Sequence, residues 1–213
     1  VVSGKVTPDG RPLLWKNRDT DFMRNHIDYV KGEKYNFIAV VNSANAYLKE
    51  AWMGTNSSGF ALMNTQSYNL VDVKGDEERG AANGRVIYRA LEVCATVEDF
   101  CHFLDTISKP SDIEANFGVI DAQGGAAMFE VDYYKYVMYD ANNPKDAPYG
   151  YIARTNFSFA GKVNEGAGYV RYMEADQVLM KASATGSITP QFIFNDLSRS
   201  FRNRMLDIDL RSG

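Results

Sequence analysis

The sequence predicts a layered α+β fold, in which helices pack on the outer faces of antiparallel sheets. Three observations support this class. Short apolar runs separated by turn-forming residues fill residues 1–64 and 116–156, as expected for strands joined by hairpins. A helical period replaces this pattern at residues 85–107 and again at 169–182. Strands, a helix pair, strands and further helices thus follow one another, and the short loops favour antiparallel pairing.

The first part of the chain is predicted to be built from hairpins. Pro8-Asp9-Gly10 forms the first turn, and the returning run ends in the polar cluster Lys-Asn-Arg-Asp at residues 16–19. A polar loop is expected at residues 20–34. Asn56 and Gly59 mark the turn of a later hairpin. The strands expected here are residues 1–7, 36–41, 45–53 and 60–64.

Helices are predicted after a charged loop at residues 71–84. The first presents Val86, Ile87 and its later apolar residues on one face. The pattern Thr96-Val-Glu-Asp99 is a capping box that starts the second helix, and Lys109-Pro110 ends it. The remaining strands are expected at residues 116–121, 126–131, 133–139 and 149–156, and the remaining helices at 169–182 and from Thr189-Pro190 onward through Phe201.

Composition fits a single domain over residues 1–213. The net charge of −4, with no Lys/Arg cluster, argues against a nucleic-acid partner. No apolar run approaches the roughly 20 residues of a membrane span, so no membrane partner is expected. The sequence begins without Met, so an export signal could have been removed. The compartment is therefore left open between the cytoplasm and export, for example to a bacterial periplasm.

The cysteines and histidines suggest no metal or disulfide chemistry. On one continuous helix the backbones of Cys94 and Cys101 would lie roughly 10 Å apart along the axis, beyond disulfide reach. A helix break near Thr96 weakens this argument without reversing it, and both cysteines are interpreted as small apolar core residues. His26 and His102 are isolated from any ligand-spaced partner, so neither a metal nor another cofactor is expected.

Two strand ends carry the polar residues best suited to catalysis. Asp19, beside Arg18, could hold an ammonium group, while the arginine balances its charge and lowers its pKa. Asn156 ends the predicted strand in Arg-Thr-Asn, where its amide could donate to a developing oxyanion. The ordinary alternatives are a turn-capping aspartate in a surface salt bridge and an asparagine that stabilises a turn. No Gly-rich phosphate loop or Gly-x-Ser-x-Gly elbow competes with them.

Four motifs in order resemble the N-terminal nucleophile (Ntn) hydrolases, in the branch that holds choloylglycine hydrolase, penicillin V acylase and the isopenicillin N acyltransferases. The motifs are Leu-Leu-Trp-Lys-Asn-Arg-Asp at 13–19, Gly-Thr-Asn-Ser-Ser-Gly-Phe-Ala at 54–61, the paired strands at 117–130, and Arg-Thr-Asn at 154–156. The series spans nearly the whole chain and is nearest to the acyltransferase-like members. The resemblance implies a four-layer αββα sandwich of antiparallel sheets covered by helices, here incomplete at both ends.

The resemblance also implies the chemistry. In this branch an N-terminal Cys, freed by self-cleavage, attacks an amide carbonyl with its own α-amine as base. Asp19 matches the aspartate that holds the nucleophile and its amine, and Arg18 lies in the same motif. Lys16 departs from the arginine that some members carry there. Asn156 matches the oxyanion asparagine. Asn64 lies near a second family asparagine, and Arg171 is similar to a late supporting arginine.

No Cys precedes Val1, so the nucleophile is expected just upstream of the sequence. The predicted function is hydrolysis or acyl transfer at a linear amide C–N bond of a small-molecule substrate: bile-salt-like, penicillin-like, or an N-acyl amino acid or peptide. Apolar contacts to the acyl group are expected from loop aromatics and Met, although such residues often simply pack: Phe22, Met23, Tyr29 and Tyr68.

Two alternatives stay open. The first is a non-catalytic ligand-binding pseudoenzyme of the same fold. The second is a fragment processed from a larger precursor, with a companion chain that supplies further strands. A homo-oligomer is also compatible with the sequence.

Overall fold

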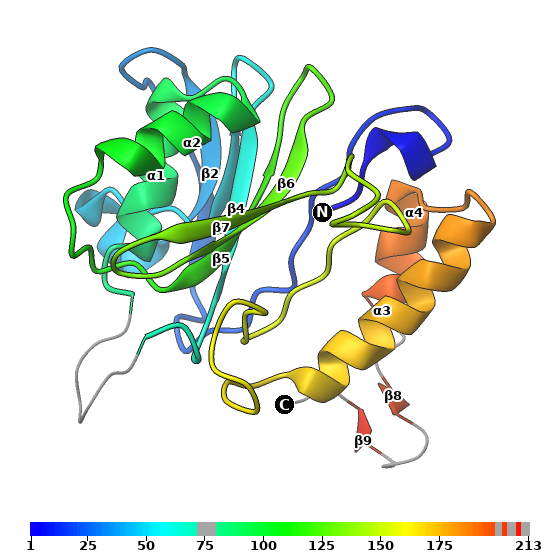
Figure 1. Cartoon of the computed structure of the whole chain (residues 1–213). Helices are drawn as coiled ribbons and strands as arrows, with labels where there is room; N and C mark the ends of the chain where they lie inside the picture. The colour runs from blue at the N-terminus through cyan, green and yellow to red at the C-terminus, as the bar shows by residue number, and fades with distance from the viewer. Residues whose placement is uncertain (72–79, 199–201, 204–207, 210–213) are drawn as a thin grey trace.

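The structure of the protein is a computed structural model that describes residues 1–71, 80–198, 202–203 and 208–209. It confirms the α+β prediction. An antiparallel sheet of seven strands lies at its centre, with the strands in the order β1-β2-β3-β4-β5-β6-β7, so that neighbours in sequence are neighbours in space (Figure 1). The short strands β8 (Arg202–Asn203) and β9 (Ile208–Asp209) form a separate two-stranded sheet. The strands are β1 Asn25–Val30, β2 Phe37–Asn42, β3 Met53–Asn56, β4 Ala61–Gln66, β5 Ala115–Ile120, β6 Ala126–Val131 and β7 Tyr136–Asp140.

Two helices, α1 (Asn83–Val93) and α2 (Val97–Thr106), cover one face of this sheet. The predicted capping box is present: the Thr96 hydroxyl accepts from the Asp99 amide, and the Asp99 carboxylate accepts from the Thr96 amide. The main hydrophobic core lies between these helices and the sheet. At its centre the ring of Phe100 contacts several other aromatic rings: Phe60, Phe103, Phe117 and Phe129.

The opposite face of the sheet carries a second, irregular β layer. Val2 pairs with Leu13 and with Tyr151 as isolated antiparallel bridges, so three segments far apart in sequence lie side by side. Helices pack outside this layer, which gives the layer order of an αββα sandwich (Figure 1). They are α3 Tyr169–Ala184, α4 Pro190–Phe192 and the continuing turn η3 Ile193–Leu197.

Separate hydrophobic clusters fill the two spaces that the second layer creates. One cluster, which includes Val1, Met63 and Met128, lies between the second layer and the sheet. The other includes Val2, Tyr151 and Leu179 and lies beneath α3. Gly118 in β5 permits the close approach, because a Cβ atom there would lie 2.9 Å from a Val1 methyl group.

Several sequence predictions of local structure are wrong. Residues 45–53 do not form a strand: the 3₁₀ turn η2 (Ser43–Leu48) occupies their first half, and the strand begins only at Met53. The expected polar loop at 20–34 contains the edge strand β1, none of whose side chains is buried. The first strand is interrupted by the 3₁₀ turn η1 (Gly4–Val6), which Ser3 caps by accepting from Lys5.

The strand predicted at residues 149–156 is also wrong, because this stretch makes only isolated bridges, at Tyr151 and Asn156. The remaining local predictions are close to the observed elements or fall partly outside the described residues. Thr189 caps the last helix by accepting from the Phe192 amide, as its pairing with Pro190 predicts. Most of the predicted loop at 71–84 and Phe201 lie outside the described residues. Cys94 and Cys101 are both free thiols, and Cys94 is buried.

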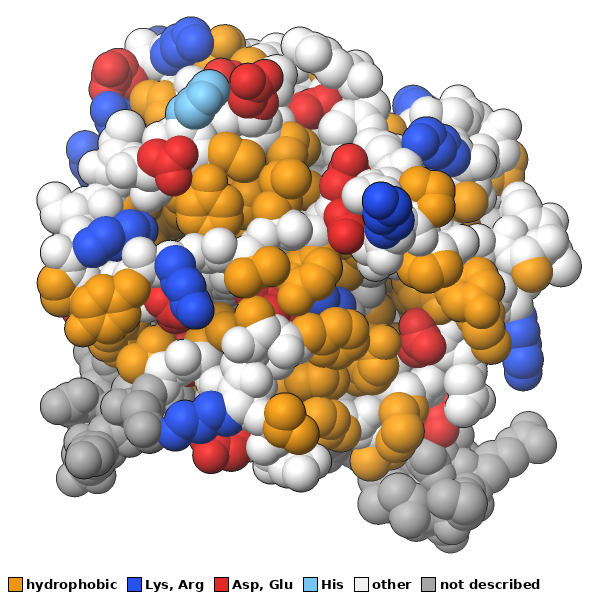
Figure 2. All heavy atoms as spheres, viewed as in Figure 1, with side chains coloured by type: hydrophobic (Ala, Val, Ile, Leu, Met, Phe, Trp, Pro, Cys, Tyr) orange, Lys and Arg blue, Asp and Glu red, His pale blue; other side chains and the backbone are white. Residues whose placement is uncertain are grey.

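The outer surface carries charges of both signs. On the face shown in Figure 2, Lys, Arg, Asp and Glu side chains are dispersed between several hydrophobic patches. Within the described part of the chain, no helix is long and apolar enough to cross a lipid bilayer.

Candidate active site

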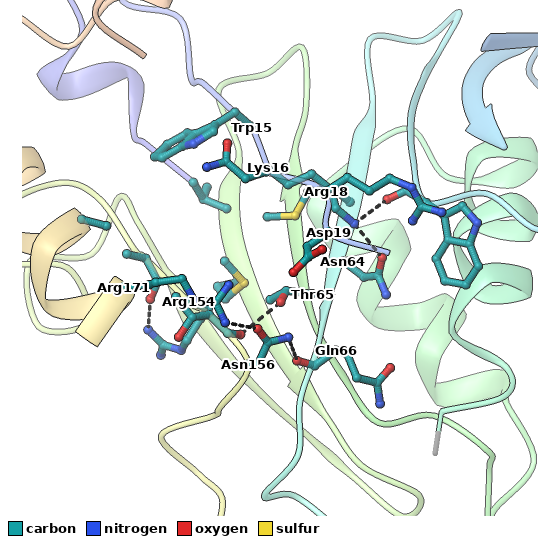
Figure 3. A pocket seen from close by; sticks show the side chains of 18 of the residues that line it. Trp15, Lys16, Arg18, Asp19, Asn64, Thr65, Gln66, Arg154, Asn156 and Arg171 are labelled. Carbon is teal, nitrogen blue, oxygen red and sulfur yellow. Dashed lines mark hydrogen bonds between the residues drawn. The ribbon is translucent and has the colours of Figure 1, made fainter. Parts of the chain in front are cut away.

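A cavity of about 580 Å³ opens between the central sheet and the second β layer. Side chains from the first returning segment, from β4, from residues 152–156 and from α3 reach it (Figure 3). Of the residues predicted for the site, those that line it are Arg18, Asp19, Phe22, Asn64, Tyr68, Asn156 and Arg171. Met23 is not among the lining residues and is 86% exposed, and Tyr29 lies on β1 away from the cavity.

Lys16 enters the cavity from the first returning segment. Its Nζ donates to the Trp52 carbonyl and to Asn64 Oδ1, both at 3.2 Å. Burial, with a smaller contribution from the nearby Arg18 charge, lowers the pKa of Lys16 to about 7. Lys16 therefore orients the side chain of Asn64.

Arg18 is held on the other side of the same segment. Its Nη2 donates to Asn42 Oδ1 at 2.6 Å, and its Nε donates to Asn25 Oδ1 at 3.2 Å. Its guanidinium also lies over the Trp52 ring, 5.0 Å from the centroid. Arg18 thus ties the segment to β1 and β2.

Asp19 is exposed and borders the cavity. Its carboxylate makes no hydrogen bond or ion pair within the described residues. Figure 3 shows it in the space between the Lys16–Asn64 side and the Asn156 side of the cavity. A carboxylate with unused acceptor capacity in this place can bind an ammonium or amine N–H.

The side-chain amide of Asn156 is fixed at both ends. Its Nδ2 donates to the Gln66 carbonyl at 3.0 Å, and its Oδ1 accepts from Arg171 Nη2 at 2.8 Å. The second N–H of Nδ2 has no partner among the described residues. Asn64, 3% exposed, is similar: its Oδ1 accepts from Lys16, while its Nδ2 is unused within the described chain. Two oriented amide donors therefore border one cavity (Figure 3).

The structure contains a buried ion pair that the sequence analysis did not predict. Arg154 Nε donates to Glu130 Oε1 at 2.6 Å, and the two side chains are 4% and 0% exposed. The guanidinium also stacks on the Phe159 ring, 3.8 Å from its centroid, and faces Tyr139 at 4.9 Å. A glutamate in the apolar run at 126–131 was the available sequence signal, because a buried carboxylate requires a partner.

The cavity is electropositive overall. Asp19 is the one carboxylate among its described lining residues, and its cationic residues are Lys16, Arg18, Arg154 and Arg171. Glu130 neutralises Arg154 from beneath the cavity wall. No cluster of three or more His, Cys, Asp or Glu side chains able to hold a metal ion occurs within the described ranges.

Residues 6–182 match the family model of acyl-coenzyme A:6-aminopenicillanic acid acyl-transferase. The chain belongs to this family. The matched stretch contains all the lining residues predicted for the site, and the motif resemblance to the acyltransferase-like Ntn hydrolases is confirmed. No curated protein matches this chain in sequence.

Solved structures similar to this acyl-transferase family member share little sequence with it. Penicillin V acylase from Agrobacterium tumefaciens is 16% identical, with a TM-score of 0.43 over 78% of this chain and 64% of that one. A mutant of conjugated bile acid hydrolase from Clostridium perfringens is 15% identical, with a TM-score of 0.46 over 82% of this chain and 67% of that one. The chain thus spans just under two thirds of the penicillin V acylase.

The lowered pKa of Lys16 predicts a pH dependence of stability. Lysine has a pKa of about 10.4 in an unfolded chain, so between about pH 7 and pH 10 the unfolded state binds more protons than the folded state. The free energy of unfolding should then rise with pH across this window. In Lys16→Met the rise should be smaller, as measured by urea unfolding at pH 6, 8 and 10. The exposed Lys135→Met is the matched control, and equal slopes in both variants would contradict the prediction.

Proposed function

We propose that this protein is an amide hydrolase or acyltransferase of the Ntn type, whose nucleophile is a Cys directly before Val1. Membership of the acyl-transferase family supports the reaction class. The observation that carries the proposal is the position of the first residues, which lead into the cavity beside Asp19, Asn64 and Asn156.

The first residues of the chain pair with two other segments. Val1 and Ile152 exchange two backbone hydrogen bonds, of 2.9 and 2.8 Å. Val2 pairs antiparallel with Leu13 and with Tyr151. Continuing both registers by two positions brings the preceding residue opposite Trp15 and Ala153. Both of these residues line the cavity, so a nucleophile at that position would face the substrate space.

The environment also suits an amine that acts as a base. Burial, with a smaller contribution from the Arg154 charge, lowers the pKa of an α-amine at Val1 to about 5. The α-amine of a cysteine one residue earlier would border the cavity that Arg154 also lines. In this proposal it is neutral before the reaction and accepts the thiol proton. The resulting thiolate is the reactive form of the side chain.

The proposed reaction uses the hydrogen-bond donors that line the cavity. The thiolate sulfur forms a bond to the amide carbonyl carbon, and the free N–H of Asn156 donates to the carbonyl oxygen as it becomes negative. Asn64, oriented by Lys16, is the second side-chain donor of this kind. The ammonium returns its proton to the leaving nitrogen as the C–N bond breaks. Water or a second amine then takes the acyl group from sulfur.

Asp19 and Arg18 have separate roles in this proposal. The unused carboxylate of Asp19 holds the α-amine of the nucleophile, which keeps sulfur and nitrogen within reach of one another. Arg18 acts indirectly by fixing the segment that carries Asp19, since its guanidinium is committed to Asn25 and Asn42.

The acyl group would lie against the apolar part of the cavity wall. Met63 and Met128 line its floor from β4 and β6, and the half-exposed Phe22 and Tyr68 lie at its border. Arg171, which also lines the cavity, acts in this arrangement by orienting Asn156. The lining residues do not support a substrate contact for Met23. Penicillin-like, bile-salt-like and N-acyl amino acid amides are the substrates to screen.

Two measurements test the proposal directly: the intact mass and the N-terminal sequence of the protein expressed from its full gene and purified. We expect a mature chain that opens with Cys followed by Val1. Opening with Ser or Thr would keep the enzyme class and change the nucleophile. Any other residue before Val1 in the mature chain would overturn the enzyme and favour the ligand-binding alternative.

Asp19→Asn should abolish turnover and leave the melting temperature nearly unchanged. The amide removes the negative charge that holds the amine, and the exposed native carboxylate makes no hydrogen bond within the described chain that folding would lose. Asp21→Asn is the matched control, because Asp21 is exposed, close in sequence and not among the lining residues. Turnover retained in Asp19→Asn would exclude this role.

Asn156→Ala should lower kcat by about 10²–10³-fold, the loss typical when one oxyanion donor is removed. Steady-state kinetics on any amide that the wild type cleaves provides the measurement. A rise in KM at constant kcat would instead identify Asn156 as a substrate-binding residue.

A further inference from the structure

A row of three polar side chains crosses the sheet beneath the segment that carries Asn156. Thr65 in β4 pairs with Asn116 in β5, and Asn116 pairs with Glu130 in β6. Directly paired residues point to the same side of a sheet, so the three side chains stand next to one another. Asn116 and Glu130 are 0% and 1% exposed, which is unusual for polar residues in the middle of a sheet.

Asn116 bonds the backbone on both sides of Asn156. Its Nδ2 donates to the Thr155 carbonyl at 3.2 Å and to the Phe157 carbonyl at 3.0 Å. Its Oδ1 accepts from the Ser158 hydroxyl at 2.6 Å, so the amide is used at both ends. The two carbonyl groups that flank Asn156 are therefore held by one buried side chain.

Thr65 and Glu130, the neighbours of Asn116 in the sheet, hydrogen-bond further backbone groups of residues 154–160. Thr65 Oγ1 donates to the same Thr155 carbonyl at 3.1 Å. Glu130 accepts from the Phe159 amide at 2.9 Å and the Ala160 amide at 2.7 Å, in addition to the Arg154 guanidinium.

These bonds replace a strand ladder. Between Arg154 and Ala160 the chain makes one isolated bridge, Asn156 with Ala167, and no regular strand pairing. Backbone carbonyl groups that face a protein interior need partners, and here sheet side chains provide them. The height of this segment above the sheet is set by the length of the side chains that hold it.

We propose that Asn116, supported by Thr65, is a positioning residue that fixes the amide of Asn156 for oxyanion binding. This inference rests on the proposed role of Asn156. Asn116 does not line the cavity and touches no substrate. It acts by setting the backbone from which the Asn156 side chain starts, while Gln66 and Arg171 set the direction of the amide itself.

The test compares two buried asparagines that make the same kind of bridge. Asn56, 7% exposed, donates from Nδ2 to the Leu91 carbonyl at 2.9 Å and the Cys94 carbonyl at 2.8 Å, on the helix-covered side and outside the cavity lining. Asn116→Ser and Asn56→Ser should therefore both lower stability. Only Asn116→Ser should lower kcat, by about 10- to 100-fold, because small misplacement of a catalytic group has effects of this size. KM should change little.

A double variant shows whether Asn116 acts through Asn156. Asn116→Ser combined with Asn156→Ala should be no slower than Asn156→Ala alone. If the two losses multiply instead, Asn116 acts by another route and the proposal is overturned.

A second readout needs no activity. The side-chain NH₂ signals of Asn156 in NMR spectra of the intact protein, assigned by their loss in Asn156→Ala, should shift or broaden in Asn116→Ser and stay unchanged in Asn56→Ser. Unchanged signals in Asn116→Ser would overturn the positioning role even if the wild type proves inactive. An inactive wild type with shifted signals would refute the proposed function alone. Should Asn116→Ser fail to fold, Thr65→Val, which removes one bond to the Thr155 carbonyl, must shift the same signals.

Discussion

The buried carboxylate of Glu130 is the constraint on which the rest of the site depends. It stands in the middle of β6, where a charge without partners would be costly. Arg154 and two backbone amides satisfy it, and all of these donors come from residues 154–160. This segment therefore cannot leave the sheet without exposing an unpaired charge to an apolar interior. The irregular layer is fixed in place although it has no ladder of its own.

The same constraint organises the cavity. Holding residues 154–160 against β4–β6 places the following segment so that Arg171, early in α3, reaches Asn156. Pairing of Ile152 with Val1 then attaches the start of the chain to the same layer. The cavity is the space left between the two β layers. Hydrogen bonds hold several of the polar groups around it in place, among them Lys16, Asn64 and Asn156.

The sequence alone was enough to predict the elements with a strong hydrophobic period and the polar site residues at strand ends. α1, α2 and strands β4–β6 are close to their expected positions, and Asp19, Asn64, Asn156 and Arg171 do meet at one cavity. The edge strand β1 was missed because none of its side chains is buried and polar residues interrupt its apolar ones. Arg154 and Glu130 were missed as partners because their pairing depends on how β6 lies beneath a segment 24 residues later in the chain.

The different partners of Lys16 and Arg18 follow from geometry that the sequence motif alone does not contain. Arg18 borders the cavity, yet its guanidinium is committed to two asparagines and to an indole ring. Lys16 instead reaches Asn64. An arginine keeps its charge at any ordinary pH, whereas a lysine with a pKa of about 7 loses it near neutrality. A neutral amine still donates a hydrogen bond to Asn64 Oδ1. The orientation of Asn64 is therefore preserved as pH rises, while the cavity loses one positive charge. A rise in pH through neutrality therefore removes a positive charge from the cavity and leaves the hydrogen bond that orients Asn64 in place.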